Sequence, residues 1–358
     1  MTTEKPCFLL QSSQLATTHL ELEEDEMSHR RLTILVILVG LIFLPAFSVQ
    51  AQTQWTAPRT LSDQPDLQGI WSNNSATPLE RPKELADKAV LSDEELAELN
   101  QRIAEIRENE QAGDILGDRL VRQALDANTP RTFDPITGNY NSFWLVEREL
   151  DHRTSLVVQP DDGRVPSLTT TAQSRAQTRR TYRQEHPSDG AEDRNFGDRC
   201  LHFGLPKIGS GYNSYHQILQ TPTHVVIFSE MAHDARIIPL DDRPQLNNDL
   251  RQWNGDARGR WEGDSLVIET SNFSPQSSFR GSGENLHLVE RFTRLAPDTL
   301  EHEVTITDNE TWTSPWTVRL ILKETQDPIF EYACHEGNYS MEGILAGARA
   351  EEANSLEN

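Results

Sequence analysis

The chain has 358 residues, of which 36% are apolar and 25% charged, and its formal net charge is −23. This length allows one large domain or two small ones, and the apolar share is too high for a wholly disordered chain. Because so acidic a protein repels phosphates, the composition argues against nucleic acids and anionic membrane surfaces as partners. The composition says little about small-molecule ligands.

The N-terminal region is predicted to be a leader rather than part of the fold. Residues 27–31 supply a cationic start, residues 32–47 form an uncharged apolar run, and Val49 and Ala51 favour cleavage after Ala51. An uncleaved membrane anchor is the alternative, although a spanning helix needs about 20 apolar residues. Residues 1–26 are acidic and unlike a leader, which favours Met27 as the true start. We therefore interpret residues 1–51 as a mis-started leader plus signal peptide, and expect a periplasmic or secreted protein with no membrane insertion after cleavage.

Export changes the meaning of the three cysteines. Cys7 is lost with the leader, which leaves Cys200 and Cys334 as an even pair in an oxidising compartment. We expect a disulfide between them, with two buried thiols as the alternative. Two cysteines alone argue against a structural metal site, and we expect neither a metal nor a cofactor.

The mature chain is expected to consist of a polar linker at 52–64, a single domain at 65–350 and a tail at 351–358. A helix is predicted at 92–110, because Ser92 and Glu95 can form a capping box and apolar side chains then recur every three or four residues. Its narrow apolar stripe needs a surface, which we expect a barrel to provide. A second helix, basic along much of its length, is predicted at 171–185.

From Tyr215 onward the sequence pattern is β. Nine short runs rich in β-branched and aromatic residues are separated by turn residues such as Glu262-Gly263-Asp264. Because no long helix lies between these runs, we expect an antiparallel meander. A meander of this length either stacks as a sandwich or closes to remove its edges. We favour closure, and therefore a mainly β fold with a barrel and N-terminal helical embellishments.

Four segments occur in order along the mature chain: PDLQGIW (65–71), EMAHDARIIPLDDRP (230–244), RGRWEGDSLVIETSNF (258–273) and YACHEGNY (332–339). Together they resemble an uncharacterised family of exported bacterial β-barrel proteins of lipocalin-like type. The resemblance implies a lipocalin-like barrel and an exported location, and it implies no reaction. Asp242 and Ala257 depart from the glycine and serine expected there, in turns where little depends on them.

Two glutamates are candidates for acid–base chemistry. Alternation places Glu290 on one face with Leu286, Leu288 and Phe292, and it places Glu230 at the end of another apolar stripe. Burial would raise the pKa of either carboxyl unless it is paired, and a carboxylic acid so placed could act as a general acid or base. The alternative is pairing with one of the nearby arginines, at positions 236, 258, 260, 280 and 291.

The densest polar cluster is Glu230, His233, Asp234 and Arg236, just after an apolar run. We expect it at a barrel rim, where binding residues concentrate. Glu230 and His233 are the predicted acid–base pair, Arg236 would fix an anionic group, and Glu290 would assist. The Glu-x-x-His spacing occurs in helical metal sites, but its second copy is missing and the segment does not read as a helix.

Further ligand-binding candidates lie in two turns. Arg258 and Trp261 flank the turn at 262–264, where strand architecture alone also explains the pattern, including an arginine that neutralises Glu269. The other candidates, His335, Asn338 and Tyr339, follow Cys334 and would form a platform held by the disulfide. A polar corner in which Asn338 satisfies backbone groups is the alternative.

These residues favour an exported barrel that binds a small, partly apolar molecule, with acid–base chemistry of isomerase or lyase type. One alternative is a passive carrier, and another is an envelope interaction protein with a filled barrel. The sequence contains no G-x-S-x-G, H-E-x-x-H or glycine-rich phosphate motif that would indicate other chemistry. The oligomeric state is left open.

Overall fold

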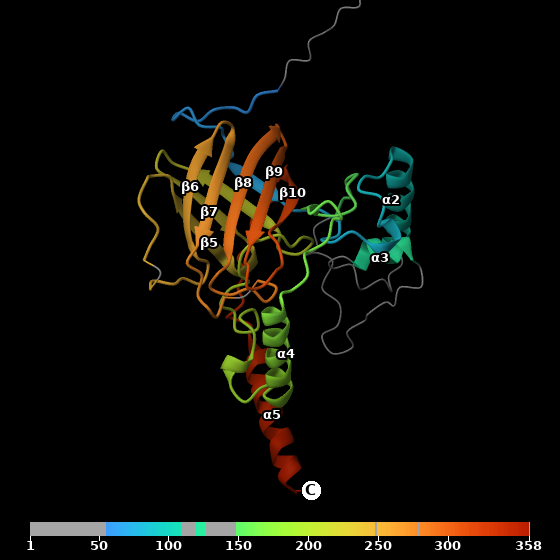
Figure 1. Ribbon diagram of the computed structural model, residues 1–358, viewed down its shortest axis with the longest axis vertical. Helices are drawn as coiled ribbons and strands as arrows, with labels where there is room; N and C mark the ends of the chain where they lie inside the picture. The colour runs from blue at the N-terminus through green and yellow to red at the C-terminus, as the bar shows by residue number, and fades with distance from the viewer. Residues whose placement is uncertain (1–54, 109–118, 127–147, 248, 278, 358) are drawn as a thin grey trace, which may run out of the picture. The chain divides into compact units, whose positions relative to one another are not determined.

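The computed structural model describes residues 55–108, 119–126, 148–247, 249–277 and 279–357 (Figure 1). All of them belong to the second of two compact units, Met1–Gln54 and Trp55–Asn358. The predicted leader, its cleavage site at Ala51 and the candidate start Met27 therefore lie outside the described residues. Within these residues, no helix is both long enough and apolar enough to cross a bilayer.

The described residues form one antiparallel sheet of ten strands, which confirms the mainly β prediction. Its order is β5-β4-β3-β1-β10-β9-β8-β7-β6, and β2 pairs with β10 beside this path. The strands are β1 (Gly69–Ser72), β2 (Val157–Gln159), β3 (Tyr215–Gln220), β4 (His224–Ser229), β5 (Asp234–Pro239), β6 (Asp256–Glu262), β7 (Ser265–Ser271), β8 (His287–Ala296), β9 (Thr299–Thr307) and β10 (Trp316–Thr325).

Short turns join β3 to β4, β6 to β7 and β8 to β9, as the turn residues predict, whereas longer connections precede β6 and β8. Glu262 pairs with Ser265 at the end of β6 and β7, so only Gly263 and Asp264 form the loop. Gly263 has a φ of 62°, which a two-residue hairpin of this hand requires and glycine adopts without strain. β1 lies between β3 and β10, so the segment PDLQGIW joins the two meanders into one sheet.

The backbone hydrogen bonds do not close the sheet into the predicted barrel. Within the described residues β5 and β6 are the two edges of the sheet and are not paired. The two strands nevertheless pack closely against each other. A Cβ atom placed on Gly259 of β6 would lie 2.9 Å from Ile238 Cγ2 and 3.6 Å from the Pro239 carbonyl oxygen, both on β5. Pro239, at the end of β5, lacks the backbone N–H that a further ladder hydrogen bond would need. On β6, the Arg258 side chain donates hydrogen bonds to the backbone carbonyls of Arg243 and Pro244.

The sheet curls so that β6 to β10 lie in front of the remaining strands in Figure 1, and the core fills the concave side. The predicted alternation of β8 is confirmed, since Leu288, Glu290 and Phe292 are all buried. Trp71 of the segment PDLQGIW is fully buried in the same core, and its Nε1–H donates to Leu67 O at 2.9 Å. The β pattern thus identified the inward residues of β8, while other large core residues, such as Trp312 and Phe273, lie in connections between strands.

The helices are α2 (Asp93–Glu108), α3 (Arg119–Leu125), α4 (Thr170–Glu185) and α5 (Tyr339–Glu357), with single turns η1 (Lys83–Leu85), η3 (Ala191–Asp193) and η4 (Met231–His233). The predicted capping box of α2 is confirmed: Ser92 N–H donates to Glu95 Oε2 and Glu95 N–H to Ser92 Oγ. The apolar stripe of α2 packs against α3 in a cluster of its own, not in the sheet core.

Two helices were not expected. α3 has only seven residues, too few for a periodic signal. α5 begins at Tyr339 and extends through 351–357, where the sequence suggested a tail. Its last turns are rich in alanine and glutamate, which favour helix even without an apolar stripe.

Candidate functional site

The predicted site residues Arg236 and Glu290 meet inside the curled sheet. Arg236 Nη1 donates to Glu290 Oε1 at 3.1 Å and Nη2 to Oε2 at 2.5 Å, and the two side chains are only 7% and 1% exposed. His302 Nε2 lies 3.1 Å from Glu290 Oε1. Burial acts to raise the pKa of Glu290, but Arg236 and His302 together lower it to about 2. Glu290 is therefore paired with an arginine, as the alternative had it, and its pKa is lowered rather than raised.

The surroundings of this pair are polar and tightly packed. The His302 ring stacks on Phe292 with centroids 4.0 Å apart, and His216 Nδ1 lies 3.0 Å from Ser229 Oγ. Burial first, and then His302, Lys207 and Arg236, lower the pKa of His216 to about 3. We call this group, Lys207, His216, Arg236, Glu290 and His302, the interior cluster.

The interior cluster encloses a cavity of about 20 Å³. That space suits a single water molecule, whereas a small-molecule site has about 300–1,000 Å³. The interior is therefore filled by side chains and does not form the hollow centre expected of a ligand-binding barrel. Reasoning from the sequence missed both His302 and His216 as interior residues, although both alternate with core residues along β9 and β3.

Glu230 and His233, the predicted acid–base pair, share one tight turn. Glu230 is only 2% exposed, and Asn213 Nδ2 donates to its Oε1 at 2.5 Å. Burial raises the pKa of Glu230, while Asn213 and the backbone of Phe330 lower it in part. The exposed His233 ring packs edge-on against Phe228 instead, at 4.8 Å, and the described residues show no side-chain hydrogen bond joining the pair. The turn thus separates the two side chains.

Arg258 and Trp261 lie on opposite faces of β6. Arg258 Nη1 forms an ion pair with Asp256 Oδ1 at 2.5 Å, while the half-buried Trp261 packs against the sheet core. Glu269 is neutralised by Arg260 at 3.5 Å rather than by Arg258, which stands directly opposite it in the ladder. These contacts give the turn an architectural role.

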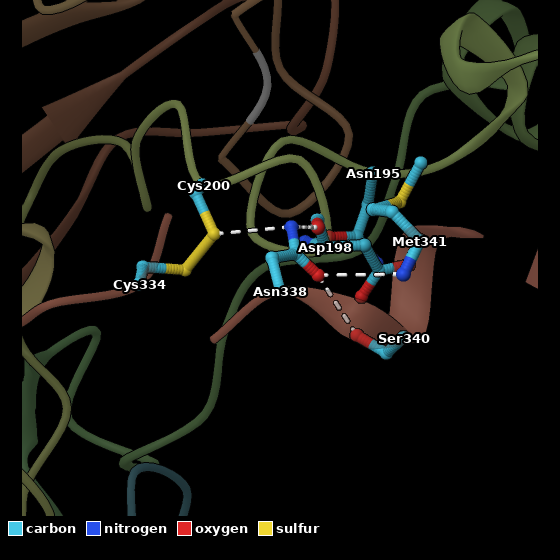
Figure 2. Close-up of a disulfide and its surroundings, with 7 residues drawn as sticks. All are labelled: Asn195, Asp198, Cys200, Cys334, Asn338, Ser340 and Met341. Carbon is cyan, nitrogen blue, oxygen red and sulfur yellow. Dashed lines mark hydrogen bonds between the residues drawn. A yellow bond between two sulfur atoms is a disulfide. The ribbon is translucent and has the colours of Figure 1, made fainter. Parts of the chain in front are cut away.

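The residues after Cys334 surround the predicted disulfide, which joins Cys200 to Cys334 across a sequence separation of 134 (Figure 2). Asn338 Nδ2 donates to Asp198 O at 2.9 Å and to Cys200 Sγ at 3.3 Å, and its Oδ1 accepts from Ser340 and Met341 at the start of α5. Asn338 therefore satisfies backbone groups, as the alternative proposed. His335 and Tyr339 are exposed.

A larger hollow lies outside the sheet, between α4 and the loop that the disulfide holds. It has a volume of about 820 Å³, and its walls include aromatic and basic side chains, among them Arg179, Arg183, Phe196, His202, Phe203 and Trp253. We call it the cleft. Its volume falls within the range of small-molecule sites, and none of the predicted catalytic residues lines it.

Three rings of the cleft contact one another. The Phe196 ring stacks on His202 at 4.8 Å and meets the edge of Trp253 at 5.0 Å, while His202 and Trp253 are 5.5 Å apart. Trp253 remains 44% exposed. A flat apolar ligand could therefore lie against an indole that the protein already holds in place.

The loop that carries these rings is closely packed. A Cβ at Gly197 would lie 2.9 Å from the Phe203 ring and 3.1 Å from Asn195 Oδ1. Asp198 N–H donates to that same Asn195 Oδ1, and Arg194 forms an ion pair with Asp198 at 2.9 Å. Together with the Cys200 disulfide, these contacts fix the aromatic side of the cleft.

His202 is the buried polar residue of the cleft. Its Nδ1 accepts a hydrogen bond from Gly204 N–H at 2.9 Å, so in the neutral ring the hydrogen is on Nε2. Burial first, and then Lys207, lower the pKa of His202, with Asp234 acting in the opposite direction. Its Nε2 has no hydrogen-bond partner among the described residues.

The sequence offered only a weak signal for the cleft. The segment PSDGAEDRNFGDRC (187–200) is typical of a loop, and Trp253 lies in a long connection without periodicity. Aromatic residues clustered beside a predicted disulfide cysteine were the available clue. The described residues contain no group of three histidine, cysteine or acidic side chains placed to hold a metal.

Comparison of the chain with protein-family models, curated proteins and solved structures produced no match.

Proposed function

We propose that this protein binds a small, partly apolar anion in the cleft. The observation that carries the proposal is the pairing of an exposed indole, held by Phe196 and His202, with the arginines of α4 on the facing wall. Aromatic faces take up apolar ring area, and guanidinium groups bind carboxylates or sulfates with two hydrogen bonds. A ligand with a flat apolar body and one anionic group matches both walls.

The charge of the lining supports an anionic ligand. Four arginines and two acidic residues line the cleft of a chain whose net charge is −23. One of the acids, Asp193, already accepts hydrogen bonds from Tyr182 Oη and from Gly190 N–H. The other, Glu192, is exposed. The charged residues of the cleft lining are thus mostly basic, whereas those of the whole chain are mostly acidic.

Binding without turnover, the carrier alternative, is the form of the proposal that the geometry supports best. Acid–base chemistry would need a proton donor and acceptor that both reach the ligand, and neither Glu230 nor His233 lines the cleft. A lipocalin-like barrel would hold its ligand inside the sheet, but the interior cavity of about 20 Å³ supports a site outside it. The Cys200–Cys334 disulfide supports a working place in an oxidising compartment, the periplasm or the exterior.

The proposal is tested with anilinonaphthalene sulfonate, a fluorescent, partly apolar anion. We expect saturable binding to the folded mature chain, and loss of at least about tenfold in affinity in Trp253→Ala, since each 1.4 kcal/mol corresponds to a factor of ten. Leu250→Ala, at an exposed apolar residue outside the cleft lining, is the matched control. Native mass spectrometry of the purified protein would show whether a ligand of this class co-purifies.

Equal binding by Trp253→Ala and the wild type would overturn the proposal. Near-ultraviolet circular dichroism of each variant separates loss of the site from loss of the fold, because the dye also binds loosened proteins.

A further inference from the structure

A second hollow lies beside α4, next to the cleft. It has a volume of about 480 Å³, and the charged side chains of its lining are all arginines: Arg175, Arg179, Arg180, Arg183 and Arg280. Leu168, Ala172, Ala176, Gln184, Gly281 and Thr311 complete the lining, so it contains no carboxylate. We call this hollow the arginine groove.

The helix α4 sets the spacing of these charges. Arg175, Arg179 and Arg183 recur every fourth residue, so they lie on one face at intervals of about 6 Å along the axis. Like charges at this spacing destabilise a helix by a few tenths of a kcal/mol per pair. Burial first, and then Arg175 and Arg183, lower the pKa of Arg179, as expected where cations lie close to one another.

Arg175 fixes the groove wall. Its Nη2 donates to Gly281 O at 3.0 Å and to Thr311 Oγ1 at 2.9 Å. The carboxylate bonded to Thr311 is Asp308, whose oxygens also accept from Glu310 N–H and Gly283 N–H. Asp308 is thus occupied in holding the loop and does not line the groove.

Three of the five guanidinium groups have no partner among the residues that the structure describes. Within the described part of the chain, Arg180, Arg183 and Arg280 form no ion pair and no side-chain hydrogen bond, although acids outnumber bases in the sequence by 56 to 33. Arginines elsewhere on the surface, such as Arg260 and Arg291, are paired with glutamates. The groove therefore keeps its positive charge uncompensated.

We propose that the arginine groove binds a compact polyanion, a small molecule that carries two or more clustered phosphate groups. The planar guanidinium fork matches phosphate oxygens with two hydrogen bonds, and the groove volume suits a small molecule. A long polyanion would also face the acidic remainder of the protein, whose net charge repels it. The groove shares Arg179 and Arg183 with the cleft, whereas Arg175, Arg180 and Arg280 line the groove alone.

The probe is inorganic tripolyphosphate, titrated calorimetrically into the folded mature chain at low and high salt. We expect saturable one-to-one binding that weakens with salt and exceeds the affinity for orthophosphate by at least about tenfold, because several guanidinium–phosphate contacts form together. The double substitution Arg180→Gln with Arg280→Gln should lower the affinity at least tenfold. These two residues line the groove and not the cleft.

The matched control removes the same charge elsewhere. Arg260→Gln with Arg291→Gln, on the outer face of the sheet, should change tripolyphosphate affinity less than twofold. Trp253→Ala should leave tripolyphosphate binding intact, which separates this site from the proposed cleft function. The inference is overturned if tripolyphosphate does not bind, if both double variants weaken it equally, or if only a long sulfated polysaccharide binds.

Discussion

Arg236 and Glu290 form a two-point ion pair although 54 residues separate them and their strands are not neighbours. Arg236 lies on β5, one edge of the sheet, and Glu290 on β8, near the opposite edge. The pair therefore crosses the concave interior of the curled sheet. It links two walls that the backbone ladder leaves unjoined, and His302 on β9 completes the contact.

Breaking this pair should be costly. Arg236→Met leaves Glu290 as a buried charge with only His302 beside it, and we expect a loss of about 3–5 kcal/mol in the free energy of unfolding. Urea denaturation measures it. The control Arg260→Gln removes an exposed partner of Glu269 and should cost less than about 1 kcal/mol. Equal losses in the two variants would show that the interior pair contributes no more than a surface pair.

The interior cluster should make the protein sensitive to mild acid. The pKa of His216 falls from 6.5 to about 3 on folding, so the unfolded chain binds a proton that the folded chain rejects. Stability should therefore fall as the pH drops from about 6.5 towards 3, by up to about 1.4 kcal/mol per pH unit. In His216→Gln this slope should be smaller between pH 6 and about 5, while carboxylates still remain ionised, and His202, whose pKa is also lowered, contributes the remainder. An unchanged slope in that window would assign the titration to another group.

Glu290 should contribute at lower pH, with the same sign. Its pKa is depressed from 4.5 to about 2, so its stabilising charge is fully present above 4.5 and is lost as the pH falls towards 2. Glu290→Gln should be less stable than the wild type at pH 7, and the difference should shrink below about pH 4. Denaturation at pH 7 and pH 3 checks this, and a difference that does not depend on pH contradicts it.

The disulfide should support both the fold and the cleft. It closes a loop of 134 residues in sequence separation and carries the segment with Phe196, His202 and Phe203. Reduction should lower the free energy of unfolding by about 5 kcal/mol in the chain-entropy model. It should also weaken binding of anilinonaphthalene sulfonate in conditions where the sheet stays folded. If a reduced, folded sample bound the dye with full affinity, the disulfide would not be needed for the shape of the cleft.

Gly197 offers a local test of cleft geometry. In Gly197→Ala the new Cβ must displace the Phe203 ring, which lies 2.9 Å away and is partly exposed. We expect weaker dye binding and a change in melting temperature of only a few degrees, because the sheet core is untouched. Gly283→Ala, where nothing lies within 4 Å of an added Cβ, is the control. A shift in dye affinity common to both variants would contradict the close approach seen at Phe203.

Local patterns were sufficient for much of the fold. Alternation in β8 identified the inward faces of Leu288, Glu290 and Phe292, and the capping box located the start of α2. Export chemistry predicted the pairing of Cys200 with Cys334. Each of these inferences depends on residues close in sequence, or on a choice with only one possible partner.

The candidate sites depended on contacts that no local pattern contains. The sequence could place Glu290 on a buried face but could not select Arg236 among five arginines as its partner, nor show that side chains would fill the interior. The cleft brings together residues from α4, from the loop on both sides of Cys200 and from the connection before β6. Which of these meet is decided by how the sheet curls and where the disulfide anchors the loop, because those long-range contacts fix the distance between segments that the chain itself leaves free.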